Sequence, residues 1–338
     1  MPDPAFLLAV VMVLALTAYA LLGGADYGGG VWDLLATGRS APEQRATISR
    51  AIAPVWEANH VWLILVVTIL FTAFPRAFGW LSVHLHIPLM LTLLGIVLRG
   101  SAFVFRAYGP GDERFSGRWG LVFAGASTIT PVLLGIIVGA ITEGRFDPEA
   151  SSFRSMYLAP WLTPFAISVG FFALVLFAYL AAVYLTLEAT RDISDLFRAR
   201  ALTAGALAGV MALIVFLLAG EAPHVRASLT RSAWAVPLHV ATGAAAFATA
   251  MMLWMRRFRA ARVAAAAQVA LIVWGWALAQ YPYLIWGHVT IQSSSAPRQV
   301  LVLLLQVVAI GAVILLPALS YLFSLFGPRH VHTGTNHK

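Results

Sequence analysis

Long apolar segments recur along the whole chain and are separated by short polar ones. Each is about 20 residues long, the length that an α-helix needs to cross a hydrocarbon core roughly 30 Å thick. Backbone exposed to lipid must form its own hydrogen bonds, and the alternation typical of barrel strands is absent, so each segment predicts a helix. We predict about nine transmembrane helices, at residues 5–22 (extending as far as 35), 52–73, 79–98, 119–142, 161–187, 201–219, 233–255, 263–285 and 299–326.

The composition agrees with this pattern. The chain has 338 residues, of which 60% are hydrophobic and only 11% charged, with a mean hydropathy of +0.84. Soluble domains contain roughly a quarter charged residues. We therefore predict an all-α polytopic membrane protein, with a single transmembrane domain at 1–328 and a polar cytoplasmic tail at 329–338. This class excludes a soluble enzyme, a disordered scaffold and a nucleic-acid-binding protein, despite an isoelectric point near 10.3.

The distribution of arginine predicts the orientation in the membrane. Fourteen arginines fall in the odd-numbered loops and six in the alternate loops. The richer set is Arg39, Arg45, Arg50, Arg99, Arg106, Arg114, Arg118, Arg191, Arg198, Arg200, Arg256, Arg257, Arg259 and Arg262. Because positive loops stay in the cytoplasm, the N-terminus is expected outside and the C-terminus in the cytoplasm. The first helix is expected to remain uncleaved, since no basic region precedes it.

One acidic residue interrupts the first apolar segment. Asp26 lies within the glycine-rich stretch at 23–30. A charged group at bilayer depth costs about 2.5–3.5 kcal/mol on insertion scales, so it must face protein, water or a partner. The glycines indicate either close packing of neighbouring helices or a helix break that serves a polar site. A nucleotide-binding loop is excluded, because the lysine and hydroxyl residue of that motif are missing.

A second polar cluster lies early in the second apolar segment. Glu57, Asn59 and His60 fall within about one helical turn, between Trp56 and Trp62. A carboxyl group at this depth suits proton transfer. The alternative is a structural hydrogen-bond cluster between helices, and the residues alone leave both interpretations open.

Cofactor sites are not indicated by the sequence. The chain contains no cysteine, which excludes thiolate metal sites. A haem held by two histidines needs them on facing helices at one depth. His60, His84, His86 and His239 are available, but their spacing gives no positive indication. We predict no metal site and no cofactor-binding site in this chain.

Several segments resemble subunit II of the cytochrome bd-type quinol oxidases. The stretch GGADYGGGVWDLL resembles that family's glycine-rich segment after the first helix, and PVWEANHVWLI resembles its W-[DE]-G-N-x-V-W-L motif. Gly28, Gly30, Trp56 and Asn59 belong to these motifs as structural residues. Supporting segments in the same order are LRGSAFVFR, WGLVFAGASTITPVLLGIIVGA and YPYLIWGHVTIQSSSAP.

The resemblance implies a subunit of a heterodimeric respiratory terminal oxidase in a bacterial inner membrane. Such a complex oxidises quinol, reduces dioxygen to water and contributes to the proton-motive force. The haems, of types b and d or b alone, belong to the haem-bearing subunit I, so this chain would hold none. It would support that partner and help form routes for protons and oxygen, with membrane lipid around it. Ubiquinol and menaquinol are both compatible, as is a small accessory subunit.

The resemblance also implies roles for individual residues. Glu57 matches an acid on a proton path from the cytoplasm, and Trp62 a residue near an oxygen route. Asp26 matches a residue of structural or polar support. The sequence departs from the family at Val104, where some members carry an acid, so His60 is the substitute titratable group that we predict. The proton-path candidates are therefore Glu57, His60 and Asp26, and no catalytic residue is assigned.

Two other functions remain open at this point. A secondary transporter would use the intramembrane acids as substrate or coupling sites beside a broken helix. A self-contained cytochrome b would bind haem without a partner.

Overall fold

The structure is a computed structural model that describes residues 3–52, 56–108 and 113–326. Within these ranges, the side chains of 56–58, 107–108, 113–114, 191 and 322–326 lie outside the described part, as does the predicted tail at 329–338. The elements are α1 (Pro4–Leu34), α2 (Ala41–Ile52), α3 (Trp56–Ala73), α4 (Pro75–His84), α5 (His86–Tyr108), α6 (Glu113–Glu143), α7 (Phe153–Tyr157), α8 (Pro164–Glu188), α9 (Arg191–Leu218), the 3₁₀ helix η1 (Ala219–Glu221), α10 (Pro223–Arg231), α11 (Ala235–Trp254), α12 (Phe258–Gln280), β1 (Tyr283–Ile285), β2 (Val289–Thr290), α13 (Ile291–Ser294) and α14 (Arg298–Phe326).

The predicted helical membrane fold is confirmed. Among the described residues, eight helices are long and apolar enough to span a membrane, and the bent pair α3–α4 brings the number to nine. The strands β1 and β2 form a short antiparallel hairpin, which was not predicted. The predicted helix at 263–285 is therefore too long at its C-terminal end, since α12 ends at Gln280 and β1 begins at Tyr283.

The third predicted helix, 79–98, is wrong in its position. Residues 75–84 form the separate helix α4, bent by 113° from α3, and α5 begins only at His86. The cause of the bend is local, since Phe74 has non-helical dihedral angles and Pro75 has no N–H to continue the helix. As a consequence, Arg99 and Arg106 lie inside α5 and not in a loop.

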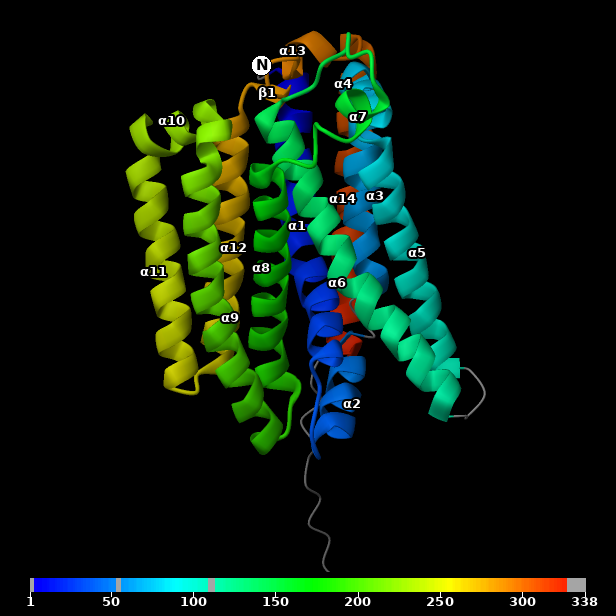
Figure 1. The fold of residues 1–338 in the computed structure, drawn as a ribbon, viewed down its shortest axis with the longest axis vertical. Coiled ribbons are helices and arrows are strands. Elements are labelled where there is room, and N and C mark those ends of the chain that lie inside the picture. Colours follow the sequence, from blue (N-terminus) through cyan, green and yellow to red (C-terminus); the bar gives the residue numbers. More distant parts are fainter. Residues whose placement is uncertain (1–2, 53–55, 109–112, 327–338) are drawn as a thin grey trace, which may run out of the picture.

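The long helices form two groups that pack side by side (Figure 1). The first group contains α1, α3, α5 and α6, and the second contains α8, α9, α11 and α12. Helices α1 and α6 both pack against α8 and join the groups, while α14 lies against α1 and α3. Helix α1 therefore contacts both groups, and it carries the fully buried Asp26.

The two ends of the molecule differ in their short elements (Figure 1). Helices α4, α7, α10 and α13 and the hairpin lie at the end where the chain begins, which we call the α4 end. Helix α2 lies at the opposite end, which we call the α2 end, together with the α8–α9 and α11–α12 connections. Because α14 also finishes there, the described chain begins and ends on opposite sides.

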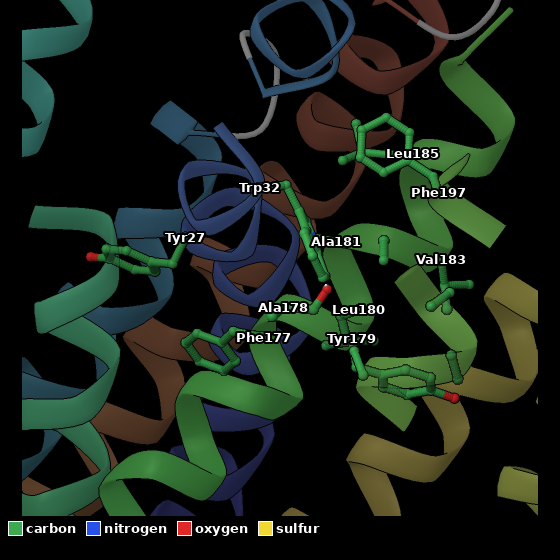
Figure 2. Close-up of a cluster of buried hydrophobic side chains, with 14 of the residues drawn as sticks. Tyr27, Trp32, Phe177, Ala178, Tyr179, Leu180, Ala181, Val183, Leu185 and Phe197 are labelled. Carbon is green, nitrogen blue, oxygen red and sulfur yellow. Dashed lines mark hydrogen bonds between the residues drawn. The ribbon is translucent and has the colours of Figure 1, made fainter. Parts of the chain in front are cut away.

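Helix α1 is continuous through its glycines, so of the two interpretations of this stretch the helix break does not hold. The glycines serve close packing instead. A Cβ added at Gly28 would lie 2.0 Å from the main-chain oxygen of Phe177 on α8. Figure 2 shows this contact region, where Trp32 Nε1 donates a 2.8 Å hydrogen bond to the carbonyl of Ala178. The missing side chains allow α1 and α8 to approach one another.

Candidate functional site

A buried ion pair joins the first and third long helices of the chain. Asp26 on α1 contacts the guanidinium group of Arg99 on α5 through Oδ1. Asp26 is 0% exposed and Arg99 is 2% exposed. Charges at this depth need an opposite charge or a strong hydrogen bond to remain. Arg99 is therefore the protein partner that a charged Asp26 needs at this depth.

The guanidinium group of Arg99 is held from several sides. Its Nε donates a 2.9 Å hydrogen bond to Ser127 Oγ on α6. Its central carbon lies 4.7 Å from the ring centre of Tyr27 and 5.1 Å from that of Phe123. Aromatic faces attract a desolvated cation. These contacts fix Arg99 so that its charge stays directed at Asp26.

A second ion pair lies nearer the α2 end. Arg106 Nη1 is 3.0 Å from Asp33 Oδ2, and Arg45 Nε on α2 is 4.0 Å from Asp33 Oδ1. Asp33 follows Asp26 by seven residues, as Arg106 follows Arg99. Seven residues are about two helical turns, or roughly 10.5 Å. Helices α1 and α5 thus carry two stacked ion pairs, leading from the α2 end into the molecule.

Helix α3 adds two polar side chains to the first pair. Asn59 is fully buried and His60 half-buried, and both interact electrostatically with the Asp26 carboxyl group. A Cβ added at Gly23 would lie 2.9 Å from Asn59 Nδ2, so this glycine makes room for the amide. The structure therefore unites Asp26, Asn59 and His60, which the sequence placed in separate segments.

This cluster is not fully satisfied by its own hydrogen bonds. Asp26 Oδ2 and both polar side-chain atoms of Asn59 lack a well-formed hydrogen bond within the described part of the chain. Buried polar atoms without partners are rare in folded proteins, and bound water commonly supplies what is missing. The arrangement suits a site that binds water or exchanges a proton.

The other residues of the predicted motif are only partly placed. The backbone of Trp56 and Glu57 begins α3, but their side chains lie outside the described residues. Trp62 is half-buried against the core, and its Nε1 has no hydrogen-bond partner among the described residues. Gly30 packs against Ser127, whose Cβ would lie 2.2 Å from an added Cβ.

A separate polar group lies at the α4 end. Thr163 Oγ1 donates a 2.5 Å hydrogen bond to Glu143 Oε2, and Arg145 Nε lies 2.8 Å from Glu143 Oε1. Arg145 also pairs with Glu221. The Arg145 and Glu221 side chains are 54% and 42% exposed. We call Glu143, Arg145, Thr163 and Glu221 the outer cluster. It contains charges of both signs, and two of its charged side chains are accessible at the protein surface.

Histidines and aromatic rings gather near the same end. His224 on α10 stacks on Trp286, with ring centres 3.3 Å apart. Burial lowers the pKa of His224 to about 4, and Gln280 nearby acts in the opposite direction. Trp80 stacks on His84 and also contacts His288. These rings pack the α4 end but do not extend the ion pairs of α1 and α5.

The described residues contain no group of three or more His, Cys, Asp or Glu side chains able to hold a metal ion. In four histidines one ring nitrogen lies within hydrogen-bonding distance of a main-chain carbonyl oxygen. These are His84, His86, His239 and His288. Whether haem is confined to a partner subunit stays a prediction.

Sequence reasoning missed the principal partner of Asp26. Arg99 was placed in a cytoplasmic loop, although it follows directly on the apolar stretch LTLLGIVL and precedes the apolar SAFVF. The spacing of seven residues in both Asp26–Asp33 and Arg99–Arg106 was the second available signal, since it places both pairs on matching helix faces.

Comparison with known proteins places the chain beside a set of bacterial membrane oxidases. The family model described as "Cytochrome bd terminal oxidase subunit II" matches residues 4–326. A relative in Bacillus subtilis, "Putative cytochrome bd menaquinol oxidase subunit II", is 24% identical over 91% of both chains. A relative in Haemophilus influenzae, "Probable cytochrome oxidase subunit 2", is 29% identical over 62% of this chain, and the match spans about half, 55%, of that relative's length.

A solved structure shares the fold. The bd oxidase from Geobacillus thermodenitrificans contains a chain that matches 96% of this one and 98% of its own length, with a TM-score of 0.80. The sequences are 23% identical, so the likeness concerns the helix arrangement alone.

Proposed function

The chain belongs to the cytochrome bd terminal oxidase subunit II family, and on this premise we propose that it serves a membrane complex that oxidises quinol and reduces dioxygen to water. Its partner would be a haem-bearing subunit I in a bacterial cytoplasmic membrane. Haem in that partner would carry the electrons and bind dioxygen. This chain's contribution would be protonic and structural, since dioxygen reduction consumes protons that must cross protein to reach a buried site.

The observation that carries the proposal is the incompletely satisfied cluster of Asp26, Arg99, Asn59 and His60. A buried ion pair used only for structure would have its lone pairs filled by hydrogen bonds. Here Asp26 Oδ2 lacks a well-formed hydrogen bond among the described residues, although Asn59 and His60 lie beside the carboxyl group. A carboxyl group with one oxygen held by arginine and the other incompletely bonded can accept a proton and pass it on.

We place the α2 end in the cytoplasm. Arginine is concentrated in the connections at that end, including Arg39, Arg45, Arg256 and Arg257, and positive loops remain cytoplasmic. Protons for the oxidase would then enter from the α2 end towards Asp26. Because the chain has no cysteine, single cysteines introduced at the two ends report the orientation by labelling in intact cells.

Purification from the native membrane tests the proposed complex. The tagged chain, isolated in mild detergent, is expected to bring a haem-bearing partner and to show quinol-dependent oxygen uptake. A colourless chain without partner would contradict the oxidase and favour transport. A Soret band that survives without a partner would favour a self-contained cytochrome.

Two variants test the role of the site. Asp26→Asn keeps the shape of the side chain but removes the titratable group, so oxygen uptake should fall by about 10²-fold while haem content is retained. Asp147→Asn is the matched control, because Asp147 is an exposed acid at the α4 end. Equal turnover in both variants would contradict the role of Asp26.

A further inference from the structure

The turn that joins α11 to α12 is strongly basic. Within seven residues it holds four arginines, namely Arg256, Arg257, Arg259 and Arg262. It lies at the α2 end of the molecule (Figure 1), and we call residues 254–263 the basic turn. Glu221 is the last acidic residue of the sequence. Any carboxylate of this chain that neutralises the basic turn must therefore come from earlier helices.

Two of these arginines are engaged by neighbouring helices. Arg256 Nη2 lies 3.1 Å from Asp195 Oδ2 on α9. The guanidinium carbon of Arg262 lies 4.5 Å from the ring centre of Tyr184 on α8, and Arg262 lines a small cavity together with Glu188 of the same helix. These contacts anchor the basic turn to α8 and α9.

The other two arginines are available to an anion from outside the chain. Arg257 and Arg259 are exposed, and neither side chain forms an ion pair among the residues that the structure describes. Asp195, the carboxylate that pairs with Arg256, also lies 3.5 Å from Arg198 through its other oxygen. Because this carboxylate is already shared by two cations, the basic turn keeps an excess of positive charge.

The backbone of the basic turn has a conformation that favours glycine. Arg256 has a φ of 57°. Its N–H donates a 3.2 Å hydrogen bond to the carbonyl of Leu253, and the Arg257 N–H donates a 2.8 Å hydrogen bond to the carbonyl of Met252. These are the two bonds of a Schellman motif, in which glycine usually occupies the left-handed position because a side chain is strained there. An arginine at such a position points to a function for its charge.

An exposed apolar face of α11 leads to the basic turn. Phe247, Met251 and Trp254 are four and three residues apart, which places them on one side of the helix, and they are 71%, 41% and 76% exposed. On α12, Val263 is 70% exposed and lies one turn beyond Arg259 on the same side. A tryptophan at the end of a membrane span lies at the level of the lipid headgroups. The two free arginines therefore lie at the depth of the lipid phosphates.

We propose that the basic turn binds the headgroup of an anionic phospholipid in the leaflet at the α2 end. Arg257 and Arg259 hold its phosphate, since guanidinium groups donate paired hydrogen bonds to phosphate oxygens. An acyl chain lies along the face formed by Phe247, Met251 and Trp254. The excess positive charge selects an anionic lipid over a zwitterionic one, because each arginine near an anionic membrane surface strengthens binding. The inference goes beyond the proposed function, since it requires neither haem nor a proton path.

The test places a fluorophore at the basic turn and a quencher on the lipid. The protein purified from its membrane carries bimane on Ala260→Cys, an exposed position in a chain without cysteine, and labelling without this substitution gives the background from any partner. In phosphatidylcholine nanodiscs, nitroxide-labelled phosphatidylglycerol should quench bimane at a lower mole fraction than nitroxide-labelled phosphatidylcholine. Arg257→Gln/Arg259→Gln should weaken the binding of phosphatidylglycerol about 25-fold, or about fivefold for each arginine. Arg231→Gln, which changes an exposed arginine at the α4 end, is the matched control and should leave quenching unchanged.

Equal quenching by the two lipid probes in the labelled protein would overturn the inference, as would a preference that survives in Arg257→Gln/Arg259→Gln. Release of the phosphatidylglycerol probe by inorganic phosphate at constant ionic strength would also overturn it, since the arginines would then bind phosphate without lipid. If the double variant loses a co-purifying protein and keeps the lipid preference, the basic turn is a protein contact instead. If the double variant does not assemble, the two single variants decide the question, because each should weaken binding about fivefold.

Discussion

The buried Asp26–Arg99 ion pair and the exposed Arg145–Glu221 ion pair at the α4 end have similar chemistry but opposite surroundings. Asp26 and Arg99 are almost completely buried, whereas Arg145 and Glu221 are about half exposed. A buried pair depends on each partner, because the charge left behind by a substitution has no water around it. An exposed pair exchanges its partner for water at little cost. The burial of a charge therefore decides how much stability is lost when its partner is removed.

The largest effect is expected from removing one charge of the buried pair. Arg99→Met should destabilise the protein by about 3–5 kcal/mol, because it leaves the Asp26 carboxylate buried and unpaired. The measurement is the thermal unfolding temperature and the yield of the purified complex.

The double variant Asp26→Leu/Arg99→Met sharpens the same comparison. It leaves no buried charge, so it should recover much of the stability lost in Arg99→Met while remaining inactive. A double variant less stable than either single variant would show that Asp26 and Arg99 stabilise the fold by more than neutralising each other's charge.

Glu57→Gln tests whether the proposed proton path at Asp26 and His60 also includes the carboxyl group at the start of α3. The substitution keeps the shape and removes a titratable group, so oxygen uptake should fall by about 10²-fold with the complex still assembled. The check is oxygen uptake at saturating quinol from mildly acidic to mildly alkaline pH. Turnover equal to the unmodified complex throughout that range would remove Glu57 from the proton path.

A smaller effect is expected in the outer cluster. Glu221→Gln should lower the unfolding free energy by about 1 kcal/mol or less and leave oxygen uptake unchanged, since the Glu221 carboxylate is 42% exposed and Arg145 keeps Glu143 as its partner. Salt should reduce even this difference, because exposed charges are screened. A loss as large as that of Arg99→Met would break the distinction between the two regions.

The smallest effect concerns His224. Its pKa of about 4 lies below the ordinary value of 6.5 because burial disfavours the charged ring. As pH falls from 6.5 towards 4, the unfolded chain binds a proton that the folded chain does not, so stability decreases over this range. His224→Phe should abolish that part of the pH dependence, as measured by unfolding temperature at pH 7 and pH 5. An unchanged slope would mean that other groups cause it.

Much of the fold follows from the apolar pattern. Helices at 299–326 and 233–255 were predicted almost to the residue, as α14 and α11 show. The failure lies at 79–98, where Phe74-Pro75 bends the chain and moves the next span forward. Hydropathy does not reveal such a bend, because an average over about 20 residues is longer than the whole of α4. Helix α2 was missed because its amphipathic, arginine-containing sequence looks like a loop on that scale.

The site was predicted in pieces. Asp26, Asn59 and His60 were singled out by the cost of polarity in lipid, but their contact depends on how α1 packs on α3. Arg99 was missed because an arginine near the end of an apolar run is usually a loop residue.

The central claim is that Asp26 changes its protonation state while the complex works, and infrared difference spectroscopy tests this most directly. Spectra of the oxidised and reduced complex should contain a carboxylic C=O stretching band that is absent in Asp26→Asn and shifted in Asp26→Glu. The Asp147→Asn complex should retain the band. A difference spectrum identical in the unmodified complex and Asp26→Asn would contradict the claim and leave the ion pair with a structural role only.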